Sequence, residues 1–440
     1  MSAPDSGRDH VTPYDRFAWS DTQVEEWLIE GAHRDELGAY FGIGEYRALS
    51  YLARRAQRAR PAAGAPRVLI VPGIMGSQLG LRRPAPLPDD IVWLDPIDIL
   101  QGRLAVLRIG AGAPVVALGA VLYSHLRLKL ALRARGFAAQ LHDYDWRLSV
   151  AELGRALAER LASSGATAVV AHSMGGLVAR AALAQPGAER IERLILLGTP
   201  NTGSFAAVQA LRGTYAVVRK VARLAAQPSA EALAGEVFSS FPSLYDLLPG
   251  PELSGRLDLL DAAAWPRSGP QPRAVLLDEA RALRPLLAPP DARFAAIVGV
   301  GQETVTAVAR RREEFVYTVT RHGDGTVPAA SAALAGTPCL YARVAHSDLT
   351  RDPLVAAAVV DLLERGHTRR LPARWRSASR AAARVSDAKL RATHAAKVDW
   401  AALSPKERRE FLQSLNEPPH YRLRVPAGRE RGSAQRTRRR

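Results

Sequence analysis

One serine of the chain lies in a sequence context that can turn a hydroxyl group into a nucleophile. The segment 167–176, TAVVAHSMGG, begins as a short buried strand, turns at Ser173 through small residues, and continues into the strong helix formers of 177–185. In the G-x-S-x-G elbow, a strained turn between a strand and a helix exposes the serine hydroxyl at the edge of a sheet. Ala171 replaces the first glycine here, and Gly175 keeps the second. We therefore predict that Ser173 is a catalytic nucleophile; the alternative is an ordinary loop that contains a serine.

A serine hydroxyl is a weak nucleophile, so this hypothesis requires a base beside it and an acid that orients the base. His346 directly follows the strand-like segment CLYARVA and is the candidate base. Asp324, in RHGDGTVP after the strand-like FVYTVT, is the candidate acid, although Asp-Gly alone is also a common turn. In α/β-hydrolases the acid and then the histidine follow the nucleophile along the chain. Asp348 is a second candidate acid, but it comes after the base and is better suited to starting a helix.

Most of the other histidines fit the role of the base less well because of their places in the chain. His172 adjoins the nucleophile, and we expect its side chain to point away from the hydroxyl, while His322 precedes the acid. The histidines that lie before or after the predicted sheet are His10, His33, His367, His394 and His420.

Acyl transfer also needs hydrogen-bond donors for the oxyanion that develops on the substrate. We expect one donor to be the backbone N–H of Met174, the residue after the nucleophile. The second is expected from the loop after the first strand, VPGIMGSQL, with Ile74 as the donor. A glycine-rich loop could instead cradle phosphate, but the Lys-Ser/Thr pair of a P-loop does not follow.

The elements that must position these residues begin with a buried strand at Arg67 and a long, partly irregular stretch to about residue 117, and from there helices and strands alternate. This alternation predicts an α/β fold, namely a mostly parallel sheet with helices on both faces. The predicted organisation is a disordered segment 1–20, a segment 21–60 with two helices, a domain 66–366, and a basic extension 367–440 that is helical and then disordered. A helical insertion at about 203–292 interrupts the domain and is expected to form a lid. We expect a long helix within 205–226 to cover an acyl pocket or to lie on an anionic membrane, since basic side chains follow one side of it.

Composition limits where the chain can work and with what it can associate. The net charge of +17 is concentrated after residue 366, where 20 lysines or arginines face 6 aspartates or glutamates. This extension could contact an anionic membrane or another polyanion. One cysteine, Cys339, cannot form an internal disulfide, and neither a signal peptide nor an apolar run long enough to cross a membrane is evident. The expected localisation is cytoplasmic, with peripheral membrane association as an alternative, and no cofactor or metal is expected; the oligomeric state is left open.

These features together resemble the lecithin:cholesterol acyltransferase family, which includes lysosomal phospholipase A2 and phospholipid:diacylglycerol acyltransferases. The resemblance covers about 67–365 and implies the α/β-hydrolase fold. It also implies an acyl-enzyme on Ser173, with His346 as base, Asp324 as orienting acid, and Ile74 and Met174 as oxyanion donors. The segments that carry it, in family order, are VPGIMGSQL (71–79), VWLDP (92–96), YDWR (144–147), AHSMGG (171–176), LGTPNTGS (197–204), VGVGQET (298–304), GDGTVP (323–328) and His346.

The chain departs from this family in two ways. The secreted members close a lid with a disulfide, which one cysteine cannot form, and Ala171 and Ser77 replace a glycine and an asparagine of the family's motifs. In YDWR, Asp145 and Arg147 are expected to be buried polar residues near the site rather than catalytic groups. The predicted function is hydrolysis or transfer of an acyl group from a lipid ester. A small-ester carboxylesterase or thioesterase, and a polyanion-binding adaptor with a relic hydrolase fold, remain as alternatives.

Overall fold

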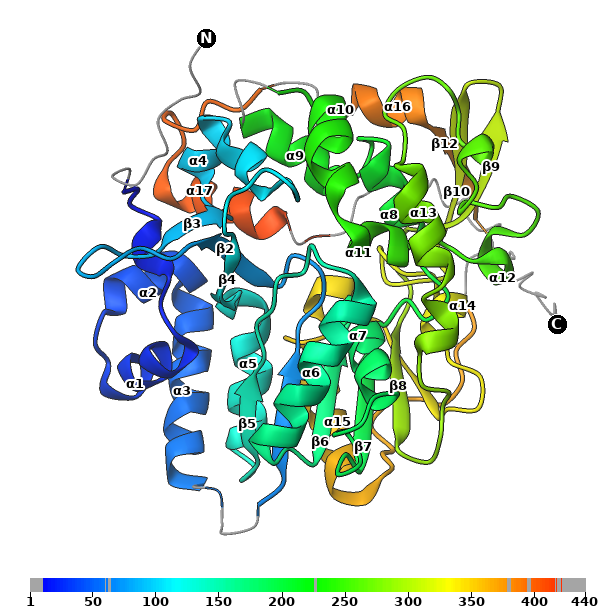
Figure 1. Ribbon diagram of the computed structural model, residues 1–440. Coiled ribbons are helices and arrows are strands. Elements are labelled where there is room, and N and C mark those ends of the chain that lie inside the picture. Colours follow the sequence, from blue (N-terminus) through cyan, green and yellow to red (C-terminus); the bar gives the residue numbers. More distant parts are fainter. Residues whose placement is uncertain are drawn as a thin grey trace, which may run out of the picture.

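A six-stranded parallel sheet forms the centre of the molecule (Figure 1). The computed structural model describes residues 11–59, 61, 65–224, 228–377, 381–393, 397–415, 417 and 421. The strand order is β11-β8-β7-β6-β1-β5, and all neighbouring strands run parallel. The strands are β1 (Arg67–Val71), β5 (Ala138–Leu141), β6 (Ala168–His172), β7 (Arg193–Leu197), β8 (Phe294–Gly299) and β11 (Cys339–Ala342).

Alternate residues of each strand face two different layers of helices. Because both faces of the sheet are buried in this way, the strands are continuous runs of apolar residues. Leu69 and Val71 belong to the core that contains α6 (Val150–Ser164) and α7 (Met174–Leu183), the helices in front of the sheet in Figure 1. Val68 and Ile70 belong to the core on the other face, which contains α5 (Leu122–Arg133) and α15 (Pro353–Arg365). This architecture confirms the predicted α/β-hydrolase fold.

Three helices, rather than the two predicted, precede the sheet: α1 (Asp21–Glu30), α2 (Arg34–Phe41) and α3 (Ile43–Ala59). They pack on the outside of α5, where they share a separate apolar core. Ser20 and Gln23 form a capping box at the start of α1.

The prediction of disorder for residues 1–20 is wrong over residues 11–20; residues 1–10 lie outside the described residues. Asp15 is fully buried, accepts a 3.0 Å hydrogen bond from the Ile91 N–H, and forms a 3.3 Å ion pair with Arg83. These partners are distant in sequence, so the local polarity of 11–20 does not reveal them.

Two small antiparallel sheets lie beside the central one. One comprises β2 (Ser77–Leu81), β3 (Asp90–Trp93) and β4 (Val116–Ala120), within a stretch that was expected to be partly irregular, and α4 (Pro96–Leu100) follows β3. The other comprises β9 (Thr304–Arg311), β10 (Glu314–Thr320) and β12 (Ala383–Ser386). The strand-like segment FVYTVT is therefore β10, which belongs to this small sheet and not to the central one. A strand's own sequence does not identify its pairing partner.

The insertion after β7 is helical, as predicted, and its helices lie above the sheet in Figure 1. It comprises α8 (Phe205–Leu211), α9 (Ala216–Leu224), α10 (Ala230–Ala232), α11 (Pro242–Asp246), α12 (Pro251–Ser254) and α13 (Ala274–Arg281); the short α14 (Ala329–Ala332) follows β10.

The long amphipathic helix expected within 205–226 is instead two helices, because the chain turns at Gly213, which has a φ of +66°. Its basic side does not face solvent. Arg212 is fully buried in a 3.1 Å ion pair with Asp387, and Arg219 donates a 2.8 Å hydrogen bond to the Thr393 carbonyl. The expectation that this side lies on a membrane is therefore wrong, because a distant part of the chain covers it.

That covering segment is the C-terminal extension, which includes β12, α16 (Asp387–Ala392) and α17 (Pro405–Ser414). β12 pairs with β10, so the extension continues a sheet of the main domain. α17 begins with a capping box formed by Ser404 and Glu407. The predicted disordered end of the extension, 424–440, lies outside the described residues. Within the described part of the chain, no helix has both the length and the apolar character needed to cross a membrane.

Candidate active site

Ser173 occupies a sharp turn between β6 and α7. Its φ is +55° and its ψ is −129°, a backbone conformation that is costly for a residue with a side chain. The turn is compact: a Cβ on Gly73 would lie 2.6 Å from the Ser173 Cβ, and a Cβ on Gly175 would lie 2.3 Å from the Pro72 carbonyl oxygen. Glycine is therefore required at position 73, in the loop that packs against the turn, and at position 175, just after the serine. Strain at this serine is the kind that functional sites retain.

The structure brings Ser173, His346 and Asp324 into one hydrogen-bonded chain. The His346 Nε2 lies 2.8 Å from the Ser173 Oγ, and the His346 Nδ1 lies 2.7 Å from the Asp324 Oδ2. A carboxylate accepts hydrogen bonds, so Nδ1 carries the ring proton and Nε2 is free to accept the proton of the serine. All three residues are buried, with Asp324 fully so. Asp348, the second candidate acid, pairs with Arg351 instead.

Backbone donors hold Asp324 in the orientation that the histidine needs. Its Oδ1 accepts hydrogen bonds from the N–H groups of Thr326 at 3.0 Å and Val327 at 2.7 Å, which leaves Oδ2 for His346. The backbone of His346 donates a further bond of 2.9 Å to the Asp324 carbonyl. A Cβ on Gly198, where φ is +58°, would come within 3.0 Å of the Asp324 Oδ2. Asp324 and His346 are thus tied together by backbone as well as by side chain.

The predicted oxyanion donors lie at the start of α7 and in the loop after β1. The N–H of Met174 is in the first turn of α7, where backbone N–H groups have no intrahelical acceptor. Ile74 lies in a turn closed by a 3.0 Å bond from the Gly76 N–H to the Gly73 carbonyl, and it lines the same cavity as Ser173. Within the described residues, no hydrogen-bond acceptor is found for either N–H group. Both are therefore available to a substrate oxygen.

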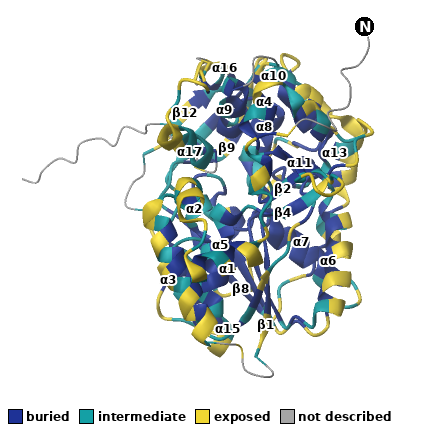
Figure 2. Ribbon diagram, turned by 90° about the vertical axis from the view of Figure 1, so that its left-hand side faces the viewer, coloured by how far each residue is buried: buried dark blue, intermediate teal, exposed yellow. Residues whose placement is uncertain are grey.

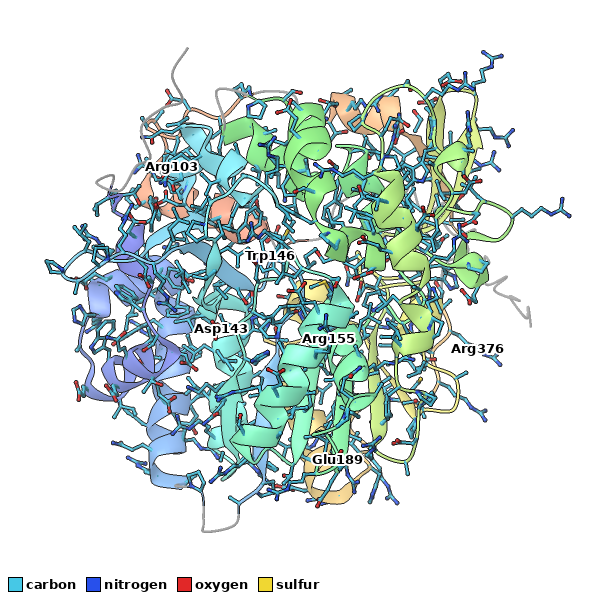
Figure 3. All side chains as sticks on the ribbon, viewed as in Figure 1. Arg103, Asp143, Trp146, Arg155, Glu189 and Arg376 are labelled. Carbon is cyan, nitrogen blue, oxygen red and sulfur yellow. The ribbon has the colours of Figure 1, made fainter. Side chains whose placement is uncertain are left out.

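The YDWR segment braces the loop that carries Ile74. The Tyr144 hydroxyl donates a 2.5 Å hydrogen bond to the Pro72 carbonyl, and the Trp146 Nε1 donates a 3.0 Å bond to the Ser77 carbonyl. Trp146 lies in the interior of the molecule (Figure 3). Arg147 pairs with Asp145 at 2.6 Å. These contacts are structural, as expected for YDWR, and those of Tyr144 and Trp146 hold the loop that carries Ile74.

Two further histidines, which sequence reasoning did not assign to the site, lie behind the base. As expected, His172 points away from the serine hydroxyl, and its Nε2–H donates a 2.9 Å hydrogen bond to the His346 carbonyl. Burial, together with the nearby His346 and His125 rings, lowers the pKa of His172 well below its usual range, so it stays neutral. Burial lowers the pKa of His125 to about 4, although its hydrogen bond to the Val121 carbonyl opposes this shift. The only signal in the sequence is that His172 adjoins the nucleophile.

A largely apolar cavity of about 120 Å³ opens at Ser173 and His346. The oxyanion loop and α8 contribute walls, and Val217 of α9 and Leu247 add apolar surface from the insertion. Leu415, from the C-terminal extension, completes the lining. No group of three or more His, Cys, Asp or Glu side chains in the described residues is arranged to hold a metal ion.

The parallel sheet and the elbow define an α/β-hydrolase fold, and comparisons with known proteins give a partial match to one family. The family described as "PGAP1-like alpha/beta domain" matches residues 153–240, which span α6, the Ser173 turn, β7 and the first helices of the insertion. No curated protein matches the chain.

Solved structures with a similar arrangement share little sequence with this chain. The structure described as "The crystal structure of Tle4-Tli4 complex" has 15% identity and a TM-score of 0.42, covering 67% of this chain and 97% of that one. The lipase BlEst2 of Bacillus licheniformis, in its mature form, has 15% identity and a TM-score of 0.35, covering 70% of this chain and 95% of that one.

Proposed function

We propose that the protein is a serine acyl hydrolase or acyltransferase that acts on a lipid ester. The observation that carries this proposal is the hydrogen-bonded chain from Asp324 through His346 to Ser173, which ends at an apolar cavity. The resemblance of motifs 71–79 and 144–147 to the lecithin:cholesterol acyltransferase family supports the same assignment. Water-excluding walls around a nucleophile favour an ester with an apolar acyl group over a charged substrate.

In the proposed reaction, the Ser173 Oγ attacks the ester carbonyl carbon while the His346 Nε2 takes the hydroxyl proton. The negative charge that forms on the carbonyl oxygen is stabilised by the N–H groups of Ile74 and Met174. The carbon–oxygen bond to the alcohol then breaks, and His346 returns the proton to the departing alcohol. The acyl group remains on Ser173 until water or a second alcohol attacks it, with His346 again acting as base. Asp324 keeps the imidazole oriented and stabilises its charged form.

The size of the cavity favours a second candidate, a carboxylesterase for small acyl groups. A cavity of about 120 Å³ is smaller than the roughly 150 Å³ apolar cavity that admits benzene. A long acyl chain therefore requires α9 or the segment around Leu415 to move, whereas a short acyl group does not. The two candidates share the same chemistry and differ in how far the cavity opens.

Fluorophosphonate labelling of the full-length protein tests the chemistry. We expect the wild type to be labelled and S173A to remain unlabelled, with both proteins showing the same thermal unfolding. Failure to label folded wild-type protein would refute the proposal.

Hydrolysis of p-nitrophenyl esters from acetate to palmitate separates the two candidate functions, and adding a long-chain alcohol shows whether the acyl group is transferred. Cytoplasmic residence remains a prediction from the sequence.

A further inference from the structure

A hollow of about 510 Å³ lies on the N-terminal helices, separate from the cavity at Ser173. Its walls come from the turn after α1, the start of α2 and one face of α3, and the two cavities share no lining residue. The three helices form the left side of the molecule in Figure 1, and the outward face of α3 is exposed in Figure 2. This hollow is therefore unrelated to the proposed acyl-transfer site.

The lining of the hollow is strongly and uniformly positive. Five of its nine lining residues are arginines and none is acidic; the arginines are Arg34, Arg47, Arg54, Arg55 and Arg58. Four of them come from α3, where spacings of three, four and seven residues place side chains on one face of a helix. Guanidinium groups remain protonated at physiological pH, so the hollow concentrates up to five positive charges.

These charges are not neutralised within the part of the chain that the structure describes. No carboxylate there forms an ion pair with any of the five guanidinium groups. Two carboxylates of the same helices instead bind α5: Glu45 pairs with Arg127 at 2.5 Å, and Glu25 pairs with Arg133 at 2.6 Å. Because no carboxylate of the described residues lies within ion-pair distance of these groups, an anion entering the hollow would relieve their mutual repulsion.

Two neutral side chains add features of a binding site. Ser50 lines the hollow, is 6% exposed, and its Oγ has no hydrogen-bond partner among the described residues. A hydroxyl left without a partner at a buried position costs stability unless a ligand satisfies it. Tyr51 is 61% exposed and lies 5.7 Å from the Arg55 guanidinium carbon, as measured to the ring centroid. This contact orients one guanidinium at the edge of the hollow.

We propose that this arginine hollow binds a phosphate-bearing anion. The planar guanidinium fork matches pairs of phosphate oxygens, and a cluster of five such groups favours an anion with several charges over a single carboxylate. The volume lies within the range of about 300–1,000 Å³ typical of small-ligand sites. A nucleic-acid strand is less suitable, since it needs an extended groove with several aromatic stacking surfaces. The phosphate comes either from a free compound or from the headgroup of a lipid.

Binding by the full-length protein tests the proposal with inorganic triphosphate as the free probe. Isothermal titration calorimetry compares the wild type with R47Q/R54Q/R58Q. We expect the affinity to fall by about tenfold or more, since losing one charge-assisted hydrogen bond costs on the order of a factor of ten. Sedimentation with phosphatidylcholine vesicles, with and without phosphatidic acid, tests the lipid source in the same variants.

The matched control is R155Q/R160Q/R190Q, which removes the same charge from exposed positions outside the hollow; Arg155 lies on α6 (Figure 3). The control should bind both probes within about twofold of the wild type, and fluorophosphonate labelling should be equal in all three proteins. A selective loss of triphosphate binding assigns a free ligand, and a selective loss of vesicle binding assigns a lipid headgroup. Equal losses in both variants, or binding only of a single-stranded oligonucleotide, would overturn the proposal.

Discussion

The ammonium group of Lys220 on α9 donates a 2.5 Å hydrogen bond to the backbone carbonyl of Ser414, at the end of α17. The next residue, Leu415, is 2% exposed and lines the cavity at Ser173. The Lys397 ammonium group likewise donates to the carbonyl of Ala222 on α9. The C-terminal extension therefore forms one wall of the candidate acyl site and is held there by cations of the chain.

Substitution of Leu415 should change the preferred acyl length. L415A enlarges the cavity, so we expect kcat/KM for octanoate relative to butyrate to rise by about threefold to tenfold, in line with the value of one or two methylene groups in an apolar pocket. L415W fills the cavity and should shift the preference toward acetate. The measurement is hydrolysis of a series of p-nitrophenyl esters.

L412A is the matched control for these variants, because Leu412 lies on α17 and packs against the core without lining the cavity. Its chain-length profile should equal that of the wild type, even if its stability falls. An identical shift in L412A and L415A would show that the effect arises from loosening of α17 and not from the wall of the cavity.

Two truncations separate the structural part of the extension from its basic end. Removal of 422–440 leaves Leu415 and its contacts intact, so ester hydrolysis and the melting temperature should stay close to wild type. Because this piece is rich in arginine, its loss should weaken binding to anionic liposomes at low salt, and added salt should reduce the difference. Unchanged liposome binding would exclude this segment as an anchor.

Removal of 398–440 also removes α17, and we expect a lower melting temperature and an altered chain-length profile.

Asp324 should matter for the rate much more than for substrate binding. D324N keeps the shape of the side chain, but its amide can donate a hydrogen bond to the His346 Nδ1 and so favour the tautomer that cannot accept the serine proton. We expect kcat to fall on the order of 10⁴-fold, as for the equivalent change in a serine protease, with KM nearly unchanged. D348N, at the second candidate acid, should retain almost full activity, and a comparable loss there would contradict the assignment.

We expect His172 to act as a positioning residue for His346, because it contacts His346 through the backbone carbonyl and not through the ring. H172F removes the N–H donor and leaves the buried His346 carbonyl without this partner. We expect kcat to fall about tenfold with KM within about twofold, a loss equivalent to one buried hydrogen bond. H172Q retains an N–H donor and should recover much of the rate. Equal rates for H172F and H172Q at equal stability would contradict this role.

Neutral burial of His125 predicts a pH-dependent contribution to stability. Its pKa is about 4 in the folded protein and about 6.5 in the unfolded chain, so between these values the unfolded chain binds more protons. The contribution is therefore complete above about pH 6.5 and is lost as the pH falls toward 4. Comparison with H125L separates the contribution of His125 to the free energy of unfolding from the contributions of other titrating groups. We expect the stability difference between wild type and H125L to change by about 1.5 kcal/mol in favour of H125L between pH 6.5 and 5, measured by urea unfolding. A difference independent of pH would contradict the neutral burial of His125.

Much of the site could be predicted because its signals are local. The strand, small-residue turn and helix around Ser173 follow from residues within about ten positions, and the same is true of the capping boxes at Ser20 and Ser404. Where the prediction failed, the deciding contact was distant. The local pattern of 205–226 has a basic side that suits a membrane, yet Asp387 and the Thr393 carbonyl cover it.

The sequence by itself determined the order of nucleophile, acid and base and the class of fold, because apolar periodicity and turn residues act over short distances along the chain. Only the tertiary structure decided that β10 leaves the central sheet, that His172 braces the base, and that Leu415 closes the cavity. Each of these depends on which surfaces meet after the chain folds back on itself. Burial of apolar surface brings segments into contact regardless of their separation in the sequence. Directional hydrogen bonds, such as that between Lys220 and Ser414, then set the relative positions of these segments.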